Sequence, residues 1–277
     1  LGERVIVFDN LSRPGVERNL HWLGNMYGSR VGVEIADVRD RNALREAVRH
    51  ASTVFHFAAQ VAVTSSLDNP SDDFEINAGG TLGLLETVRA MKTPPGLVYT
   101  STNKVYGSLD DIPLHLHGFR YEPEDREIRR SGIDERRPLD FHSPYGCSKG
   151  AADQYVSDYA RVFGLQTVVF RMSCIYGPHQ FGTEDQGWVA HFLIRALRGE
   201  PITVYGDGRQ VRDILFVEDL VDAFLLARER ISSLSGNTFN IGGGSSNMVS
   251  LGELLEIIGD LHGAIPEIQY GKWRTGD

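Results

Sequence analysis

Tyr145 and Lys149 are the two residues whose types and spacing most clearly predict chemistry. Residues four apart on a helix place their side chains on the same face. A phenol has an ordinary pKa of about 10, which is too high for a general base near neutral pH. A neighbouring ammonium group favours the phenolate and lowers that pKa. The pair therefore predicts acid–base chemistry on a hydroxyl group, with Lys149 also able to hold a ribose.

Thr102 supplies the hydroxyl group that would position a substrate alcohol for this chemistry. It follows an apolar run at 96–101 that predicts a buried strand. A surface Tyr–Lys pair has the same spacing as a catalytic one, so the pair alone decides little. Its place after a strand that ends in the segment 99–107 favours the catalytic interpretation.

The elements around these residues predict an α/β fold. Short apolar runs, rich in β-branched residues, alternate with segments of helical periodicity. Such alternation implies right-handed βαβ units and a doubly wound, Rossmann-like parallel sheet. The expected strands are 5–8, 31–36, 53–58, 96–101 and 166–171, and the expected helices are 40–50, 72–91 and 144–163.

The pattern changes after Gly177, which predicts a smaller second lobe. We expect a cofactor-binding domain at 1–173 that carries the catalytic residues, and a substrate lobe at 174–277 with some return to the core sheet. Residues 108–138 are highly charged, lack periodicity and read as a long surface insertion of no evident function. In the second lobe, helices are expected at 186–198, 217–229 and 251–261, and strands at 202–205 and 237–241.

Charge and cysteine content exclude several classes of function. The net charge of −9 gives no general attraction to a phosphate backbone, so nucleic acid is not an expected partner. Cys147 and Cys174 form neither a disulfide framework nor a metal cluster, so we expect no metal and a reducing compartment, the cytoplasm. No apolar run approaches the roughly 20 residues that span a bilayer.

Carboxylates at two strand ends are candidates for binding a nucleotide. Asp9 ends the first strand, where a carboxylate can accept both hydroxyls of an adenosine ribose and repel a 2′-phosphate. Asp37 and Val38 follow the next strand and could meet an adenine. A turn or helix-capping role explains either carboxylate as well. The small residues of the segment 56–60 would let a flat cofactor approach the backbone.

Two groups in the second half fit a nucleoside diphosphate. Arg212 offers a guanidinium suited to bidentate phosphate binding, although an ion pair with Asp213 is an equal alternative. Gln186 and Trp188 open a helix whose amides and aromatic ring could meet phosphate or base, although Trp188 could equally be a core residue.

Together these segments resemble the extended short-chain dehydrogenase/reductase family, in its sugar-nucleotide epimerase and dehydratase branch. The resemblance implies NAD as cofactor, a nucleoside-diphosphate sugar as substrate, and a homodimer formed through the helices at 72–91 and 144–163. A narrower likeness within the branch favours a CDP-hexose; it rests on 19–23, 101–107, 140–155 and 185–188. The family resemblance itself rests on 6–12, 56–59, 77–81, 99–107, 145–149 and 208–213.

The resemblance also implies a role for each candidate residue. The catalytic residues would be Tyr145 as acid/base, Lys149 as its partner and Thr102 as the substrate-positioning hydroxyl. The cofactor would be held by Asp9, Asn10, Asp37, Val38, Phe57, Ala58, Ala59, Asn77, Thr100, Tyr145 and Lys149. The substrate would be held by Thr102, Asn103, Lys104, Cys174, Gln186, Trp188, Tyr205 and Arg212.

The chain also departs from the family pattern in two ways. The family's glycine-rich loop should precede Asp9 by about 20 residues, so we expect it, and the first strand that carries it, to lie upstream of Leu1. The sequence also stops at Asp277, before the family's usual end. If the loop does not exist, a non-catalytic nucleotide-sugar-binding protein becomes the alternative.

The residues after Thr102 favour epimerisation over elimination of water. Dehydratases of this branch place Asp-Glu directly after the catalytic threonine, whereas this chain has Asn103 and Lys104. Without that carboxylate pair there is no evident acid and base for elimination. The expected activity is therefore reversible epimerisation through a transient keto sugar, and a 4-epimerase is the nearest alternative.

Overall fold

The centre of the fold is a four-stranded sheet in the order β11–β7–β4–β3, with every neighbouring pair parallel. Its strands are β3 (Thr53–His56), β4 (Gly96–Thr102), β7 (Thr167–Met172) and β11 (Thr238–Ile241). The computed structural model describes residues 2–264 and 266–274, so the two chain ends named in the sequence analysis lie outside the described residues. Of these four strands only β11 comes from residues 174–277, and it pairs with β7.

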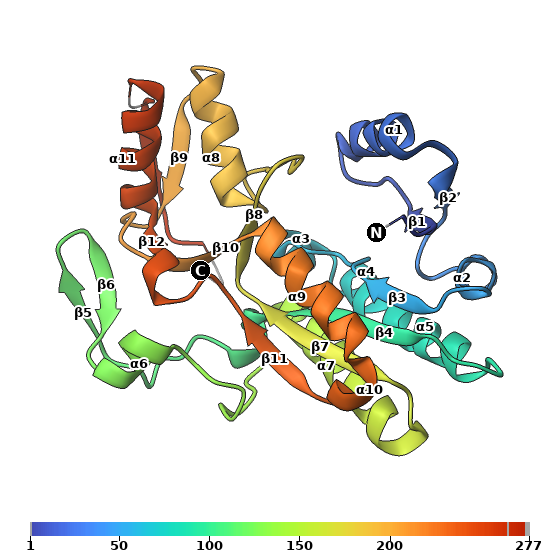
Figure 1. The fold of residues 1–277 in the computed structure, drawn as a ribbon. Helices are drawn as coiled ribbons and strands as arrows, with labels where there is room; N and C mark the ends of the chain where they lie inside the picture. The colour runs from blue at the N-terminus through green and yellow to red at the C-terminus, as the bar shows by residue number, and fades with distance from the viewer. Residues whose placement is uncertain (1, 265, 275–277) are drawn as a thin grey trace.

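Helices cover both faces of this sheet, as Figure 1 shows. Because side chains alternate along a strand, Leu97 and Tyr99 of β4 point to one face and Val98 to the other. The first face packs on α5 (Gly80–Arg89) and α7 (Ser143–Phe163), and the second on α9 (Val217–Glu229) and α10 (Ile231–Leu234). The predicted doubly wound α/β fold is therefore confirmed.

The first two strands form a separate parallel sheet. It pairs β1 (Val5–Asp9) with β2 (Val31–Ile35), and it carries α1 (Val16–Tyr27) and α2 (Arg41–Val48). Figure 1 shows this part to one side of the central sheet. Within residues 2–264 and 266–274 no strand joins β1 to β3. In the doubly wound order that position belongs to the first strand of the fold.

The segment 72–91, predicted as one helix, is not regular throughout. It comprises α4 (Pro70–Phe74), a π-helical turn at Glu75–Gly79 and α5. Asn69 begins it by accepting a hydrogen bond from the amide of Asp72. A π turn inserts one extra residue, which hydrophobic periodicity does not reveal, and such turns are frequent at functional sites. A shorter helix, α3 (Val63–Asp68), precedes it.

The second lobe has its own apolar core, drawn wholly from residues after 174. Phe192, Val204 and Leu255 are among its buried side chains. β10 (Val211–Phe216) runs parallel to β8 (Cys174–Tyr176) and antiparallel to β12 (Met248–Ser250). The remaining elements are α8 (Trp188–Leu197), β9 (Ile202–Tyr205), α11 (Leu251–His262) and β13 (Ile268–Gly271). No helix in the described part of the chain is long and apolar enough to cross a membrane.

The charged insertion contains more regular structure than its sequence suggests. It forms an antiparallel hairpin of β5 (Leu114–His117) and β6 (Arg120–Pro123), followed by α6 (Arg126–Ser131). Polar contacts tie it to the second lobe: Arg120 forms a salt bridge with Glu253 at 2.6 Å, and the hydroxyl of Tyr121 donates to Asp207 at 2.6 Å. Because charged and polar side chains hold the hairpin in place, the sequence has no apolar periodicity there that would predict its strands.

Candidate active site

Tyr145 and Lys149 lie in the first turns of α7, as their spacing predicts. The backbone amide of Tyr145 donates to Ser66 of α3 at 3.2 Å, which fixes the start of α7 against the preceding helices. Lys149 is buried, and its Nζ donates to the carbonyl oxygen of Thr100 at 2.5 Å. The same Nζ lies 4.4 Å from the centre of the Tyr99 ring. Lys149 therefore links α7 to the carboxyl end of β4.

Thr102 ends β4 beside the phenol of Tyr145. Its Oγ1 accepts a hydrogen bond from the amide of Lys104 at 3.2 Å and so caps the 3-10 turn at Asn103–Tyr106. Burial raises the pKa of Tyr145 to about 12, and a hydrogen bond with Thr102 opposes that rise. The expected depression of the Tyr145 pKa is therefore not found, because desolvation outweighs the favourable groups. With its pKa raised in this way, Tyr145 is protonated near neutral pH and can donate a proton.

Burial also controls the charge of Lys149. Desolvation lowers the pKa of Lys149 to about 7, while the carboxylates of Asp153 and Asp73 act in the opposite direction. A lysine with a pKa in that range exchanges its proton near neutral pH. The group that supports Tyr145 is thus itself able to take up or release a proton.

A buried polar cluster behind Lys149 was not predicted from the sequence. Ser148 donates to Asp73 at 2.5 Å, and the side-chain amide of Asn77 donates to both residues, at 3.0 and 3.2 Å. Burial raises the pKa of Asp73, and its hydrogen bond with Ser148 opposes the shift. Two polar residues four apart on an otherwise apolar helix face, Asp73 and Asn77, are the signal that could have revealed this cluster.

A second buried group joins α7 to β7 and β11. Arg171 donates to both carboxylate oxygens of Asp153 at 2.9 Å and to the hydroxyl of Tyr106 at 2.8 Å. Tyr106 in turn donates to Asn240 at 2.7 Å. The two ions of the pair are almost completely buried. Their fork-shaped contact fixes α7, and with it Lys149, relative to the sheet.

The ends of β1 and β2 bring the predicted adenosine-binding residues together. The amide of Leu11 donates to the carboxylate of Asp9 at 2.7 Å, and Asn10 donates to that of Asp37 at 3.2 Å. Arg39 also donates to Asp37 and holds the pKa of that carboxyl well below its usual range. Parallel strands end at one edge of their sheet, so these carboxylates fit a ribose and an adenine as acceptors.

The other predicted cofactor residues lie at the ends of β3 and β4, or in the helix beside them. Asn77 accepts a hydrogen bond from the amide of Gln60 at 2.9 Å, which holds the loop containing Ala58 and Ala59. Phe57 lies in the same loop, and its ring stacks on Phe224 of α9 with centroids 5.3 Å apart. Buried Thr100 offers its carbonyl to Lys149. Val38 is buried against Gly80, where a Cβ would lie 2.7 Å from its side chain.

The predicted substrate residues are spread over both lobes. Gln186 accepts a hydrogen bond from Arg13 at 2.9 Å, and Trp188 packs edge-on against Phe192. Arg212 donates to the Val211 carbonyl at 3.1 Å from within β10. Cys174 begins β8, Asn103 and Lys104 begin the turn after Thr102, and Tyr205 ends β9. The structure thus gathers the predicted catalytic residues at the end of β4, and leaves the predicted substrate residues on several elements.

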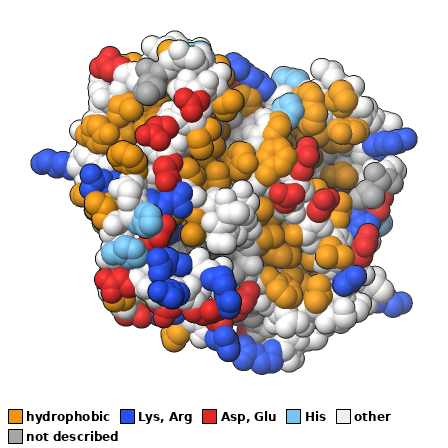
Figure 2. All heavy atoms as spheres, turned by 60° about the vertical axis from the view of Figure 1, so that its left-hand side comes forward, with side chains coloured by type: hydrophobic (Ala, Val, Ile, Leu, Met, Phe, Trp, Pro, Cys, Tyr) orange, Lys and Arg blue, Asp and Glu red, His pale blue; other side chains and the backbone are white. Residues whose placement is uncertain are grey.

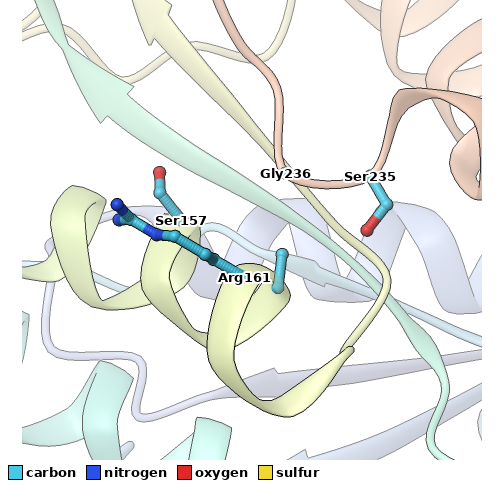
Figure 3. A pocket seen from close by; sticks show the side chains of 5 residues that line it. Ser157, Arg161, Ser235 and Gly236 are labelled. Atoms are coloured by element: carbon cyan, nitrogen blue, oxygen red, sulfur yellow. The ribbon is translucent and has the colours of Figure 1, made fainter.

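Two cavities border these regions. One of about 390 Å³ lies between α3 and the second lobe, and Tyr205 is among its lining residues. Arg274 lies over the Tyr205 ring at 3.6 Å and forms a salt bridge with Glu184 at 3.2 Å. The other, of about 360 Å³, is shown in Figure 3 between Ser157 and Arg161 of α7 and the loop before β11. Ser157 lies about 18 Å along α7 from Tyr145, which separates that cavity from the catalytic residues.

Comparison with known proteins relates this geometry to one family. Residues 1–242 match the model of the NAD dependent epimerase/dehydratase family. The chain is 48% identical to CDP-paratose 2-epimerase of Salmonella typhi over 94% of this chain and 77% of that protein. It is 30% identical to a putative UDP-glucose 4-epimerase of Methanocaldococcus jannaschii over 99% of this chain and 79% of that protein.

Solved structures show the same similarity. UDP-glucose 4-epimerase of Thermotoga maritima, solved with UDP-glucose, superposes with a TM-score of 0.80 at 30% identity, covering 100% of this chain and 80% of that chain. A dTDP-glucose 4,6-dehydratase from Streptomyces venezuelae, solved with NAD, gives a TM-score of 0.80 at 28% identity, covering 100% of this chain and 77% of that chain. The similarity therefore extends over both lobes.

Proposed function

The chain belongs to the NAD-dependent epimerase/dehydratase family, and from that premise we propose that it interconverts CDP-paratose and CDP-tyvelose by inverting C2 of the hexose. Membership of the family confirms the expected enzyme and the expected cofactor, NAD. The observation that carries the choice of substrate is the 48% identity to CDP-paratose 2-epimerase over most of both chains.

The catalytic residues proposed for this reaction are Tyr145, Lys149 and Thr102. Tyr145 removes a proton from the sugar hydroxyl as the carbon is oxidised and returns it as the carbon is reduced. Thr102, hydrogen-bonded to the phenol, positions that hydroxyl. Lys149 is the proposed partner of Tyr145, able to exchange a proton near neutral pH, and donates to a ribose hydroxyl. The transient keto sugar must turn over between the two steps to expose its other face.

NAD, when bound, accepts a hydride from the sugar carbon and gives it back. The donor and acceptor groups present fit this cofactor at both of its ends. Asp9, Asn10 and Asp37 would hold the adenosine, and Thr100, Tyr145 and Lys149 the nicotinamide ribose. Ala58 and Ala59 leave room for the cofactor beside the loop that Asn77 fixes. We further propose that Phe57 and Val38 complete the walls of the site.

The absence of an acidic pair after Thr102 supports epimerisation over dehydration. Asn103 accepts a hydrogen bond from the hydroxyl of Thr102 at 3.4 Å and can neither give nor take the proton that elimination of water requires. Lys104 follows it in the same turn. Asn103 therefore offers neither an acid nor a base for elimination, and Tyr145 remains the proposed acid/base group.

The remaining parts of the proposal concern substrate and assembly. Residues 174–277 form the substrate lobe, in which Cys174, Gln186, Trp188, Tyr205 and Arg212 contact the CDP-hexose, while 1–173 bind the cofactor. We propose a homodimer through α5 and α7, where Tyr155, Val162 and Phe163 of α7 are exposed apolar side chains. The expected location is the cytoplasm.

Product analysis by NMR tests the proposed reaction. The purified full-length protein is incubated with CDP-paratose and NAD, with Tyr145→Phe as the inactive reference. The expected product has an inverted configuration at C2. Inversion at C4 of a UDP-hexose, with CDP-paratose unchanged, would support the 4-epimerase alternative. Tight binding of CDP-paratose without any product would support a binding protein.

A further inference from the structure

The hairpin of the charged insertion carries three side chains suited to metal binding. His115 and His117 are two residues apart on β5, so they lie on the same face of the hairpin. Glu122 of β6 pairs directly with His115. One potential ligand atom from each of the three residues lies within 4.8 Å of the others. The three residues come from the two strands of the hairpin, and the pairing of β5 with β6 brings them together.

The state of His115 is the second observation that points to a ligand. Its Nδ1 is buried and has no hydrogen-bond partner among the described residues. A buried polar atom without a hydrogen-bond partner is uncommon in folded proteins and is unfavourable. His117 and Glu122 lie beside it, with Nδ1 of His117 3.9 Å from a carboxylate oxygen of Glu122. A bound cation would give the unpaired nitrogen a partner.

From this geometry we propose that His115, His117 and Glu122 bind a divalent transition metal of the zinc class. Two imidazoles and a carboxylate suit zinc, whereas magnesium and calcium prefer oxygen ligands alone. Tetrahedral zinc needs ligand atoms about 3.3 Å apart, so binding requires the three side chains to move closer together than the 4.8 Å within which they now lie. Arg129 lies 3.5 Å from Oε2 of Glu122, the same oxygen that lies 3.9 Å from Nδ1 of His117, and so can orient the carboxylate towards the site.

The construction of the hairpin explains what such a metal would do. Isolated two-stranded hairpins are marginally stable. The opposite face of β5 gives little support, since Leu114 and Leu116 are 56% and 49% exposed. Figure 2 turns forward the side of the molecule on which Figure 1 places the hairpin, and histidines lie there among charged side chains. The metal would clamp β5 to β6 and stabilise the insertion.

Calorimetric titration of the metal-free, tag-free full-length protein with zinc tests this site. We expect one zinc per chain and negligible binding of magnesium. His115→Ala with His117→Ala should weaken binding about 100-fold, and Glu122→Gln about tenfold. His262→Ala removes an exposed histidine of α11 and is the matched control, with unchanged affinity.

A second readout separates loss of ligands from loss of folding. Zinc should slow amide hydrogen exchange in residues 114–123 of the wild type and of His262→Ala, and leave the double variant unchanged. Circular dichroism must show that each variant is folded, and Glu122→Gln keeps a polar side chain of the same size if the double variant does not fold. Absence of zinc binding by the wild type, or unchanged binding by the folded variants, would overturn the proposal.

Discussion

The proposed catalytic residues at the start of α7 and the proposed substrate residue Tyr205 of the second lobe have different surroundings. At the start of α7, Lys149 is buried and held by the Thr100 carbonyl, with the Asp73–Ser148 pair behind it. On the substrate side, Tyr205 and Arg274 contact each other and Glu184 at the border of a cavity. A site that repeats one redox step needs fixed groups, whereas a site that admits a sugar nucleotide and lets a keto sugar turn needs room.

Removing the proposed acid/base group, the hydroxyl of Tyr145, should lower activity more than any other change considered. We expect Tyr145→Phe to lower kcat by about 10²–10⁴-fold, the usual contribution of general acid–base catalysis. Substrate binding should change little, because the ring remains. Tyr270→Phe, which changes an exposed tyrosine of β13, is the control. Retention of epimerase activity by Tyr145→Phe would remove Tyr145 from the mechanism.

Breaking the buried ion pair between Arg171 and Asp153 tests whether that pair holds α7 in place. Arg171→Met leaves the carboxylate of Asp153 buried without its partner, and we expect unfolding to become easier by about 3–5 kcal/mol. Arg161→Met removes a pair of the same kind from the exposed side of α7, at 3.3 Å from Asp158, and should cost at most about 1 kcal/mol. If chemical denaturation showed equal losses in the free energy of unfolding for the two variants, the buried pair would not be the stronger support of α7.

The low pKa of Lys149 makes stability depend on pH in a defined window. Its folded-state pKa, about 7, lies below the ordinary value of 10.5, so the unfolded chain binds more protons between these values. Stability from this group is therefore fully present above pH 10.5 and is lost as the pH falls towards 7.

Lys149→Met should abolish this dependence. The free energy of unfolding of the wild type, relative to that of the variant, is expected to rise between pH 7 and pH 9, as measured by denaturant titration at each pH. Activity should be lost at every pH. A difference in stability that stays constant with pH would show that Lys149 keeps an ordinary pKa in the folded protein.

The smallest effects are expected on the substrate side. Arg274→Met removes the cation above the Tyr205 ring and the salt bridge to Glu184, groups that are partly exposed and screened by solvent. KM should rise about 1.5- to 5-fold, which corresponds to about 0.2–1 kcal/mol, with kcat nearly unchanged. A fall in kcat as large as that of Tyr145→Phe would show that the two regions are not mechanically distinct.

Features set by local sequence patterns could be predicted from the sequence, whereas features set by packing could not. Strand-end residues and a Tyr–Lys pair one helical turn apart follow from local periodicity, so β4 and α7 were predicted, and Thr102, Tyr145 and Lys149 do lie together. Their catalytic role is our proposal. The π turn at Glu75–Gly79 and the Asp73–Ser148 contact depend on how helices pack, and periodicity does not reveal them. The hairpin at 114–123 was missed because charged side chains anchor it. The pKa of Tyr145 was misjudged because desolvation depends on burial, which spacing does not give.

The most direct test of the account follows a deuterium label placed at C2 of CDP-paratose. If the hydride leaves and returns within one active site, the product is inverted at C2 and keeps the label, and Tyr145→Phe forms it about 10²–10⁴-fold more slowly. A product inverted at C2 that has exchanged its label with solvent, or a Tyr145→Phe protein as active as the wild type, would contradict the mechanism.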